Sequence, residues 1–258
     1  MYPELTRNPV FNDFFNLTIT YRLSADITTT YGALIHKTSQ KLVKPSEWLR
    51  PKSNSTKELS LYGLTDFKSR KKDIAWIVSN CKAPSHREDY VQLLKNVANS
   101  SLRIDIYGKC GNLKKHGFKG FKDRKLIDSA YQEIAKDYKF YLSLENSICT
   151  DYVTEKFFNA LKYGILPITN VKNVAKFALP HSYLNINDFN STEDLMKTLE
   201  NLSPNQELYN SYFWWNEFYR GVEDTQFKTQ CQFCDILNEN GFKSANNYSK
   251  FGNYWNKC

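Results

Sequence analysis

The sequence predicts an α/β protein with a mainly parallel sheet that helices cover on both faces. Short apolar runs typical of buried strands alternate with amphipathic segments long enough for helices. The alternation is clearest over residues 139–169, where a strand, a polar turn, a helix and another strand follow one another. Amide, acidic, lysine and tyrosine side chains crowd the polar turn, which makes it the first candidate for a binding site.

Local patterns predict the elements along the chain. Residues 16–31 alternate and are rich in Thr, Ile and Tyr, which predicts a strand followed by a loop; the polar stretch 37–60 predicts a linker or surface excursion. Strands are then expected at 73–81, 103–108, 139–146 and 165–169, and helices at 86–99, 125–138, 151–164 and 191–202. The aromatic stretch after residue 212 predicts further helix.

Two of the expected helices carry an apolar face. In the helix at 86–99 the expected buried residues are Tyr90, Leu93, Leu94 and Val97. In the helix at 151–164 they are Val153, Phe157, Ala160 and Leu161, and Gly164 stands where a glycine would end that helix.

Composition narrows the class of partner. The 258 residues are 41% hydrophobic and 24% charged, as in an ordinary globular protein, and carry a formal net charge of +8. This excess favours anionic partners, which could be nucleic acid, phosphates, nucleotides or an anionic membrane surface. The Lys and Arg residues are spread over the whole chain and form no basic stripe, so nucleic acid is not expected as a partner. No run of 18 or more apolar residues is present, so this chain is expected to contain no transmembrane segment.

The six cysteines are Cys81, Cys110, Cys149, Cys231, Cys234 and Cys258. Their even number permits complete pairing, but the connectivity stays open. Cys231 and Cys234 form a C-x-x-C pair, yet no second pair of ligands follows at similar spacing, so a zinc ribbon is not expected.

Three turns leave the carboxyl ends of the expected strands: 79–87, 107–112 and 145–156. Ligands of doubly wound sheets bind outside these ends, so the three turns are candidates for one shared site. Gly108 and Gly111 would let the backbone approach a base or ribose closely. Neither a P-loop nor a dinucleotide fingerprint is present.

The third turn has two interpretations. Asp151 is a plausible N-cap whose helix would offer its first amides to an anion, with Lys156 adding a positive charge. Glu155 would face roughly 100° away and could bind sugar hydroxyls. The alternative is a capping residue followed by a solvated surface pair. Likewise, Arg87 could grip a diphosphate or be an exposed arginine, and Tyr152 could contact ribose or phosphate or simply pack.

The segment 139–169 strongly resembles the signature of the α1,3-fucosyltransferases, family 10 of the glycosyltransferases. It stands here as FYLSLENSICTDYVTEKFFNALKYGILPIT over 140–169, with Leu144 where the signature has Phe. Residues 15–32, the segments VSNC…HREDYVQLL and IDIYGKCG, and the stretches LYNSYFWWNEFY and CQFC resemble other parts of the family in the same order. The resemblance therefore covers nearly the whole chain.

The resemblance implies a GT-B fold. Residues 61–212 would form the Rossmann-like donor domain that binds GDP-fucose, and 1–60 a remnant of the N-terminal acceptor domain with a linker. Residues 213–258 would form a helical, cysteine-containing tail. The implied reaction is inverting transfer of L-fucose from GDP-fucose to a GlcNAc hydroxyl of a glycan in α1,3 linkage, with an N-glycan or LacNAc-type acceptor.

The resemblance also implies donor-binding residues. Arg87 and Lys156 would hold the diphosphate, so that no metal is required and Mn²⁺ would be a stimulatory ion only. The remaining contacts to phosphate, ribose, fucose and guanine would come from Asn146, Tyr152, Glu155, Tyr107 and Gly108, with Arg22 projecting towards the cleft.

The sequence departs from the family pattern at the expected position of the catalytic base. The family's glutamate lies in an E-S-P-like motif, which by spacing falls at or before Met1; Glu4 is a weak candidate because it follows Pro3 instead of preceding proline. The chain is therefore expected to be N-terminally truncated, with Cys231 and Cys234 lacking their partners. The full-length form would be a type II Golgi membrane protein. The alternative is a donor-binding remnant without turnover.

Overall fold

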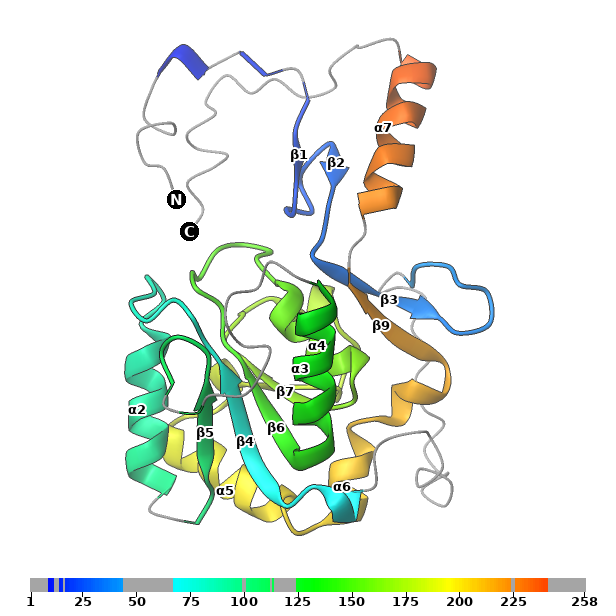
Figure 1. Ribbon diagram of the computed structural model, residues 1–258. Helices are drawn as coiled ribbons and strands as arrows, with labels where there is room; N and C mark the ends of the chain where they lie inside the picture. The colour runs from blue at the N-terminus through cyan, green and yellow to red at the C-terminus, as the bar shows by residue number, and fades with distance from the viewer. Residues whose placement is uncertain are drawn as a thin grey trace.

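The computed structural model of the chain describes residues 9–11, 14–15, 17–43, 67–98, 101–111, 113, 124–223 and 226–240. Its centre is a five-stranded parallel sheet in the order β5-β4-β6-β7-β8 (Figure 1). The strands are β4 (Lys72–Ile77), β5 (Ile104–Tyr107), β6 (Tyr138–Ser143), β7 (Leu166–Thr169) and β8 (Leu184–Asn185). The prediction of an α/β protein with a mainly parallel sheet is confirmed.

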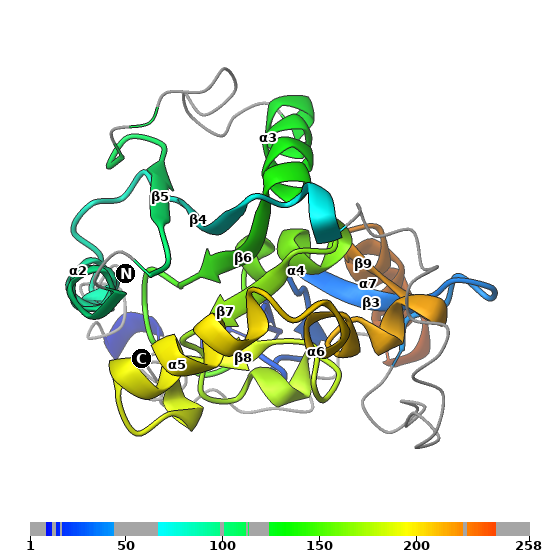
Figure 2. The same ribbon diagram turned by 90° about the horizontal axis from the view of Figure 1, so that it is seen from below.

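Helices cover the sheet on both faces. Figure 2 shows α2 (Arg87–Ala98) and α5 (Thr192–Leu202) on one face and α3 (Arg124–Asp137) on the other. α4 (Glu155–Lys162) packs with α3, and α6 (Gln206–Ser211) follows α5. The short 3₁₀ helices are η1 (Pro9–Phe11), η4 (Phe67–Ser69), η5 (Val174–Lys176), η6 (Ile186–Asp188) and η7 (Trp214–Glu217).

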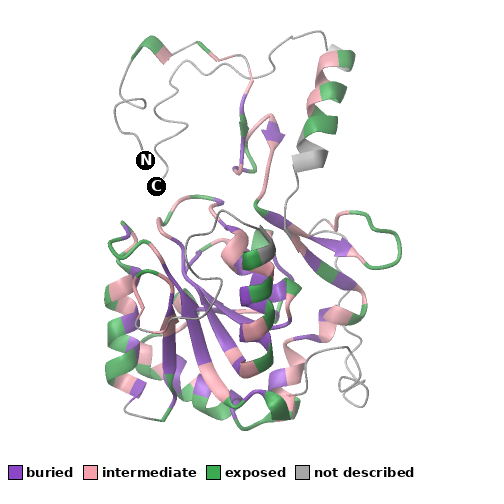
Figure 3. Cartoon of the chain, viewed as in Figure 1, coloured by how far each residue is buried: buried purple, intermediate pink, exposed green. Residues whose placement is uncertain are grey.

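The central strands are buried on both faces, as the purple strands of Figure 3 show. All of β7 is buried, and in β6 every residue except Lys139 is buried. Parallel strands between two helical layers have no solvated face, which explains why they are continuous apolar runs rather than alternating ones. This is the physical reason why the strands were recognisable in the sequence.

The order of the strands creates a switch point at the carboxyl edge. The chain leaves β4 through α2 to reach β5, whereas it leaves β6 through α4 to reach β7 on the opposite side. Open α/β sheets bind ligands at such a switch point, so a ligand is expected at the turns after β4 and β6.

The expected apolar face of α2 is confirmed in part: Leu94 is buried and Tyr90 and Val97 pack against the core, whereas Leu93 is 54% exposed. The buried residues of the helix are Arg87, Val91, Leu94 and Ala98. The first of them, Arg87, has its guanidinium 5.6 Å from the Trp76 ring centroid. A charged residue at the start of a buried stripe is invisible to a search for apolar periodicity.

The apolar face of α4 is confirmed, since Val153, Phe157, Ala160 and Leu161 are each at most 2% exposed. Phe158 is buried as well, at 1% exposed, so α4 is enclosed on more than one side. The additional cover comes from two strands that the sequence did not predict: β3 (Gly32–His36) and β9 (Tyr219–Glu223), which pair antiparallel.

Two expectations about the strands outside the central sheet are wrong. Residues 219–223 form a strand instead of continuing the expected helix, and α7 (Gln226–Asn240) begins only after it. Residues 16–31 hold two strands, β1 (Ile19–Thr20) and β2 (Ile27–Thr28), which pair with each other in parallel. β3 and β9 were missed because each is short and its partner lies far away along the chain.

Part of the sequence analysis lies outside the described residues. Glu4, most of the predicted linker at 37–60, and the proposed boundary at residue 60 are among these. Over the described ranges, the helices are too short or too polar to cross a membrane.

The close packing of β3 on α4 gives the first prediction. A Cβ atom at Gly32 would lie 2.3 Å from Cγ of Phe158, a core residue that cannot move away. Gly32→Ala is therefore expected to lower the free energy of unfolding by about 2 kcal/mol, as overpacking of a core does. Urea unfolding would measure it. Thr38→Ala, in the exposed turn after β3, is the control and is expected to change stability by less than about 0.5 kcal/mol; equal effects would contradict the packing argument.

Candidate functional site

The three turns at the carboxyl edge of the sheet are joined directly to one another. The Ser85 amide donates to the Asn146 carbonyl at 3.0 Å, and the Ser85 hydroxyl donates to the Glu145 carbonyl at 2.7 Å. Cys81 and Cys110 form a disulfide between the first and second turns, and the Cys110 amide donates to the Val78 carbonyl at 3.1 Å. The turns after β4, β5 and β6 thus form one connected edge.

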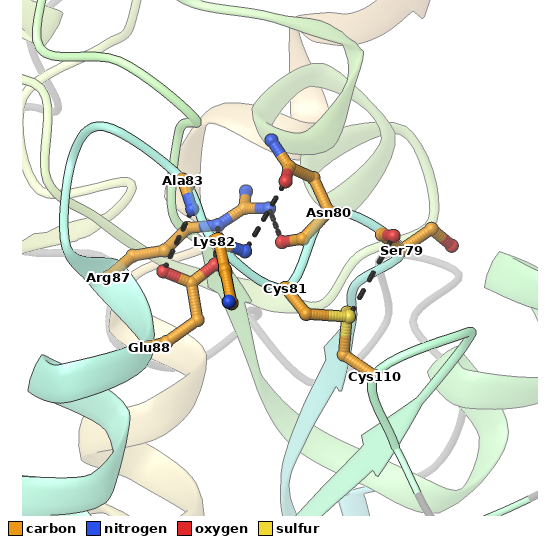
Figure 4. Close-up of a disulfide and its surroundings, with 8 residues drawn as sticks. All are labelled: Ser79, Asn80, Cys81, Lys82, Ala83, Arg87, Glu88 and Cys110. Atoms are coloured by element: carbon orange, nitrogen blue, oxygen red, sulfur yellow. Dashed lines mark hydrogen bonds and ion pairs between the residues drawn. A yellow bond between two sulfur atoms is a disulfide. The ribbon is translucent and has the colours of Figure 1, made fainter.

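The disulfide resolves part of the open cysteine pairing. Cys81 and Cys110 are 29 residues apart, and Figure 4 shows their bridge beside Ser79 and close to Arg87. Cys149 is also disulfide-bonded. Cys231 and Cys234 are free and exposed on α7.

Arg87 is a buried arginine, so the alternative of an exposed one is excluded. It is 3% exposed, and its guanidinium donates to the carbonyls of Leu144 at 2.7 Å and Asn80 at 3.1 Å. Its Nε lies 3.3 Å from Oε1 of Glu88 (Figure 4). A guanidinium has five N–H donors, and these contacts use three of them. Arg87 therefore ties the β4 turn to the end of β6 and keeps donors for a ligand.

A cavity of about 500 Å³ opens beside Arg87. Its wall combines the start of α2 with residues that follow β6, β7 and β8. Asn170, Lys172 and Asn187 belong to this wall, and the sequence analysis missed them. The signal that could have found them is their position, since each lies within three residues of the end of a strand, as the start of each predicted turn does. Leu93, which the prediction placed in the core, lines this cavity instead, and Tyr90 lines it while also packing against the core.

Beyond the end of β6 lies a buried charge network that the sequence analysis also missed. The Glu145 carboxylate is fully buried and accepts from the amide of Thr154 at 2.8 Å and its hydroxyl at 2.8 Å. Nζ of Lys156 lies 3.2 Å from Glu145 and 3.3 Å from Glu155. Glu145 is part of the ENS triplet of the quoted motif, but the sequence did not show that it would be the buried partner of Lys156.

Burial and pairing set the protonation of this network. Burial raises the pKa of Glu145, against the opposing effects of Lys156 and of the Thr154 hydrogen bonds. Burial alone would lower the pKa of Lys156, but the charges of Glu145 and Glu155 raise it overall. Lys156 therefore keeps its positive charge. Its side chain is 16% exposed and its Nζ is paired, so the alternative of a solvated surface pair is excluded.

Asp151 does not cap the helix, contrary to the prediction. α4 begins at Glu155 with Thr154 as its N-cap, and Asp151 has a left-handed backbone with φ of 63°. The Asp151 carboxylate is used elsewhere: it accepts from the Leu23 amide at 3.1 Å and from Asn173 at 2.6 Å. The Thr154 amide, which was expected to bind an anionic ligand, donates to the Glu145 carboxylate instead. This amide is therefore not available to a ligand.

The remaining predicted residues divide into two groups. Tyr152 lies with Lys156 and Glu155 on the α4 side, and burial raises its pKa. Arg22 is 4% exposed in the segment whose Leu23 amide binds Asp151, so it lies beside the same turn. Asn146 lies between this side and Arg87. In the described part of the chain, its Oδ1 is buried without a hydrogen-bond partner, as is Oγ of Ser79, and unsatisfied buried atoms of this kind mark places where a ligand can bind.

Tyr107 and Gly108 are held for structural reasons. The Tyr107 side chain is 3% exposed, and its hydroxyl lies 2.6 Å from that of Tyr138 in the core towards α3. Gly108 has φ of 90°, and a Cβ there would lie 2.5 Å from the Val78 carbonyl oxygen. The close approach that requires glycine is thus made by the protein's own backbone, and Tyr107 could meet a ligand only through its main chain.

Fold and site together define a class: a Rossmann-like α/β domain whose switch point holds a buried arginine, a paired lysine and unsatisfied amide and hydroxyl groups. Such a site suits an anionic nucleotide ligand. Within the described ranges, His, Cys, Asp and Glu side chains form no cluster of three or more that could hold a metal ion.

Comparison with known proteins identifies the family. The family described as "Glycosyltransferase family 10 (fucosyltransferase) C-term" matches residues 67–252. Alpha-(1,3)-fucosyltransferase C of Drosophila melanogaster is 34% identical over 251 residues, 95% of this chain and 55% of that protein. Glycoprotein 3-alpha-L-fucosyltransferase A of the same species is 31% identical over 258 residues, 98% of this chain and 45% of that protein. The chain spans about half the length of these curated relatives.

A solved structure of an alpha1,3-fucosyltransferase with GDP shares the fold. Its TM-score is 0.50 at 22% sequence identity, covering 72% of this chain and 51% of that one. The chain belongs to glycosyltransferase family 10, the fucosyltransferases, and its α/β fold is that of the GT-B members of this family.

The buried ion pair predicts a pH-dependent loss of stability. Lys156→Met would leave the Glu145 carboxylate buried without its cation, at a cost of roughly 3 kcal/mol near neutral pH. Burial already raises the pKa of Glu145 above its ordinary 4.5, and loss of Lys156 would raise it further. A carboxyl with a raised folded-state pKa favours folding at low pH, and this contribution is lost as the pH rises through that pKa. Urea unfolding should therefore show a smaller deficit at about pH 5 than at about pH 7.5.

Two variants control this experiment. Lys162→Met removes a lysine from the same helix, but its partner Asp128 is 32% exposed, so the expected cost is below about 1 kcal/mol. Glu145→Gln/Lys156→Met removes both charges and should recover part of the loss. Equal deficits at both pH values, or an equal cost of Lys162→Met, would contradict the buried-pair interpretation.

The disulfide gives a separate prediction. Cys81→Ser/Cys110→Ser would release a loop with a sequence separation of 29, and is expected to lower the free energy of unfolding by about 3 kcal/mol. Guanidinium unfolding without reductant measures the loss. Cys231→Ser/Cys234→Ser changes the same residue type at free, exposed positions and should alter stability by less than about 0.5 kcal/mol; indistinguishable double variants would refute the prediction.

Proposed function

We propose that this chain binds GDP-fucose at the switch point between β4 and β6, as part of an enzyme that transfers L-fucose to a glycan. The proposed reaction is inverting transfer to a GlcNAc hydroxyl in α1,3 linkage, with an N-glycan or LacNAc-type acceptor. The observation that carries the proposal is Lys156, held by buried Glu145 beside Tyr152 within a family-10 domain. Arg87 lies on the other side of the same turn.

The two cations suit the leaving group of this reaction. When the bond between fucose and GDP breaks, the diphosphate gains negative charge, and fixed positive groups that face it stabilise the transition state. Arg87 and Lys156 are both held by the protein before any ligand arrives, so little reorganisation is needed. We propose that they hold the diphosphate without a required metal, with Mn²⁺ as a stimulatory ion only.

The other contacts follow from where the residues lie. Asn146 would accept from a sugar hydroxyl at its unsatisfied Oδ1 or donate its side-chain N–H to the phosphates, and Glu155 and Tyr152 would contact ribose or fucose. The guanine would lie near the turn at Gly108, bound through main-chain atoms. Arg22 would approach from the N-terminal segment.

The catalytic base and the acceptor site remain proposals on family grounds. The base would be a glutamate of the acceptor domain, for which Glu4 is a weak candidate outside the described residues. The complete enzyme would work in the Golgi as a type II membrane protein. The alternative for this chain is donor binding without turnover.

Calorimetry with GDP tests the donor site. The wild-type chain should bind GDP, whereas Arg87→Lys and Glu145→Gln/Lys156→Met should bind it roughly tenfold or more weakly, because each loses a charge-assisted contact to phosphate. Lys95→Met removes an exposed lysine at the end of α2 and should bind like wild type. Circular dichroism confirms that each variant is folded. Absence of binding by wild type, or unchanged binding by both site variants, would refute the proposal.

A transfer assay separates the two candidate functions. The chain is incubated with labelled GDP-fucose and either a LacNAc-type or an N-glycan acceptor, and fucosylated product is measured. Turnover by this chain would exclude binding without catalysis. GDP binding without product on any acceptor would favour the donor-binding alternative.

A further inference from the structure

We propose that Tyr31 is a substrate-contacting residue of the donor site, which recognises the sugar of the nucleotide sugar and so contributes to donor selectivity. The inference rests on the proposed function and deepens it. Tyr31 comes from the N-terminal segment, here residues 17–36, and not from the sheet edge that carries the diphosphate residues.

Tyr31 belongs to a cluster of three tyrosines around the predicted donor residue Tyr152. The ring centroids of Tyr21 and Tyr31 lie 5.1 Å and 6.0 Å from that of Tyr152, both in edge-to-face geometry. Tyr21 and Tyr31 are 6.4 Å apart. The N-terminal segment therefore builds one wall against the turn that carries Tyr152.

Among these three tyrosines, Tyr31 presents the most surface. It is 40% exposed, whereas Tyr21 and Tyr152 are only partly accessible. Burial raises its pKa, and the charges of Glu155, Lys156 and Glu145 act on it as well, so its hydroxyl lies within electrostatic reach of the buried charge network. A tyrosine that served only to pack would not need to face solvent beside that network.

Contacts on both sides of Tyr31 hold its segment against the rest of the protein. It directly precedes β3, and the next residue, Gly32, packs against the Phe158 side chain of α4 so closely that a Cβ there would lie 2.3 Å from the ring. Eight residues earlier, the Leu23 amide is bound by the Asp151 carboxylate at 3.1 Å. The N-terminal segment is thus fastened to the turn at one end and to α4 at the other, as a preorganised binding residue requires.

The chemistry of this wall suits a sugar. A tyrosine offers an apolar ring to the C–H face of a pyranose and a hydroxyl to its oxygens, without a charge that would need a counterion. If Lys156 holds the phosphate, the sugar attached to that phosphate must lie within one bond of it. Tyr31 packs against Tyr152, in the turn that leads to Glu155 and Lys156, whereas the guanine is expected at the β5 turn. The sugar is therefore the part of the donor that it can reach.

Calorimetry on the full chain with GDP, GDP-fucose and GDP-mannose tests the inference. Tyr31→Ala is expected to bind GDP-fucose about tenfold more weakly than wild type, yet GDP within about twofold, because GDP lacks the fucose that Tyr31 would contact. The preference for GDP-fucose over GDP-mannose should shrink. Tyr31→Phe keeps the ring and the packing, and should lose about threefold in GDP-fucose affinity through the hydroxyl alone. Tyr212→Ala is the control, since it truncates a partly buried tyrosine that stacks on His181, away from the site.

The outcomes separate the two levels of the proposal. Failure of the wild-type chain to bind GDP and GDP-fucose would overturn the proposed function, and this inference with it. If wild type binds both, unchanged GDP-fucose affinity in both Tyr31 variants would overturn the inference alone. Equal loss of GDP and GDP-fucose affinity in Tyr31→Ala, with Tyr31→Phe unchanged, would also overturn it, because the residue would then support the wall without touching the sugar.

Discussion

The ion pair between Glu145 and Lys156 joins the end of β6 to the first turn of α4, and most of the site follows from it. Glu145 is fully buried, so its charge is tolerable only because Lys156 and Thr154 satisfy it. This requirement sets where α4 begins, since the Thr154 amide is held by Glu145 and Asp151 is released for other contacts. The strand β3 and the N-terminal segment then pack on a helix whose position is already determined.

The second cation, Arg87, is held by a different set of contacts, at the start of α2. Arg87 is inserted between two turns and donates to the carbonyls of both, while the Cys81–Cys110 disulfide joins the first of these turns to the next strand's exit. In each case a positive group is placed by protein acceptors before a ligand binds. Donors that are fixed in this way cost little reorganisation when charge develops on a leaving group, which is why the arrangement suits transfer from a nucleotide sugar.

The success of the sequence analysis varied with how local each feature is. The apolar stripe of α4 was visible because Val153, Phe157, Ala160 and Leu161 follow the helical period. The face of α2 was predicted only in part, because its buried stripe also includes Arg87, which becomes tolerable in the core only through carbonyls supplied by other turns. β3 and β9 were missed because neither is stable alone, and each is short and far from the other in the chain.

The alternation of buried runs and amphipathic segments determined the parallel sheet from sequence, and the motif at 139–169 determined the family. Both depend on residues that are neighbours in the chain, so they can be recognised from the sequence alone. The partners of charged groups are not encoded locally: that Glu145 would be the buried counterion of Lys156, that Asp151 would bind Leu23 instead of capping a helix, and that Tyr31 would reach Tyr152 all depend on packing between distant segments. The strength of each pairing depends on how far its groups are removed from water, and this removal occurs only when the chain folds.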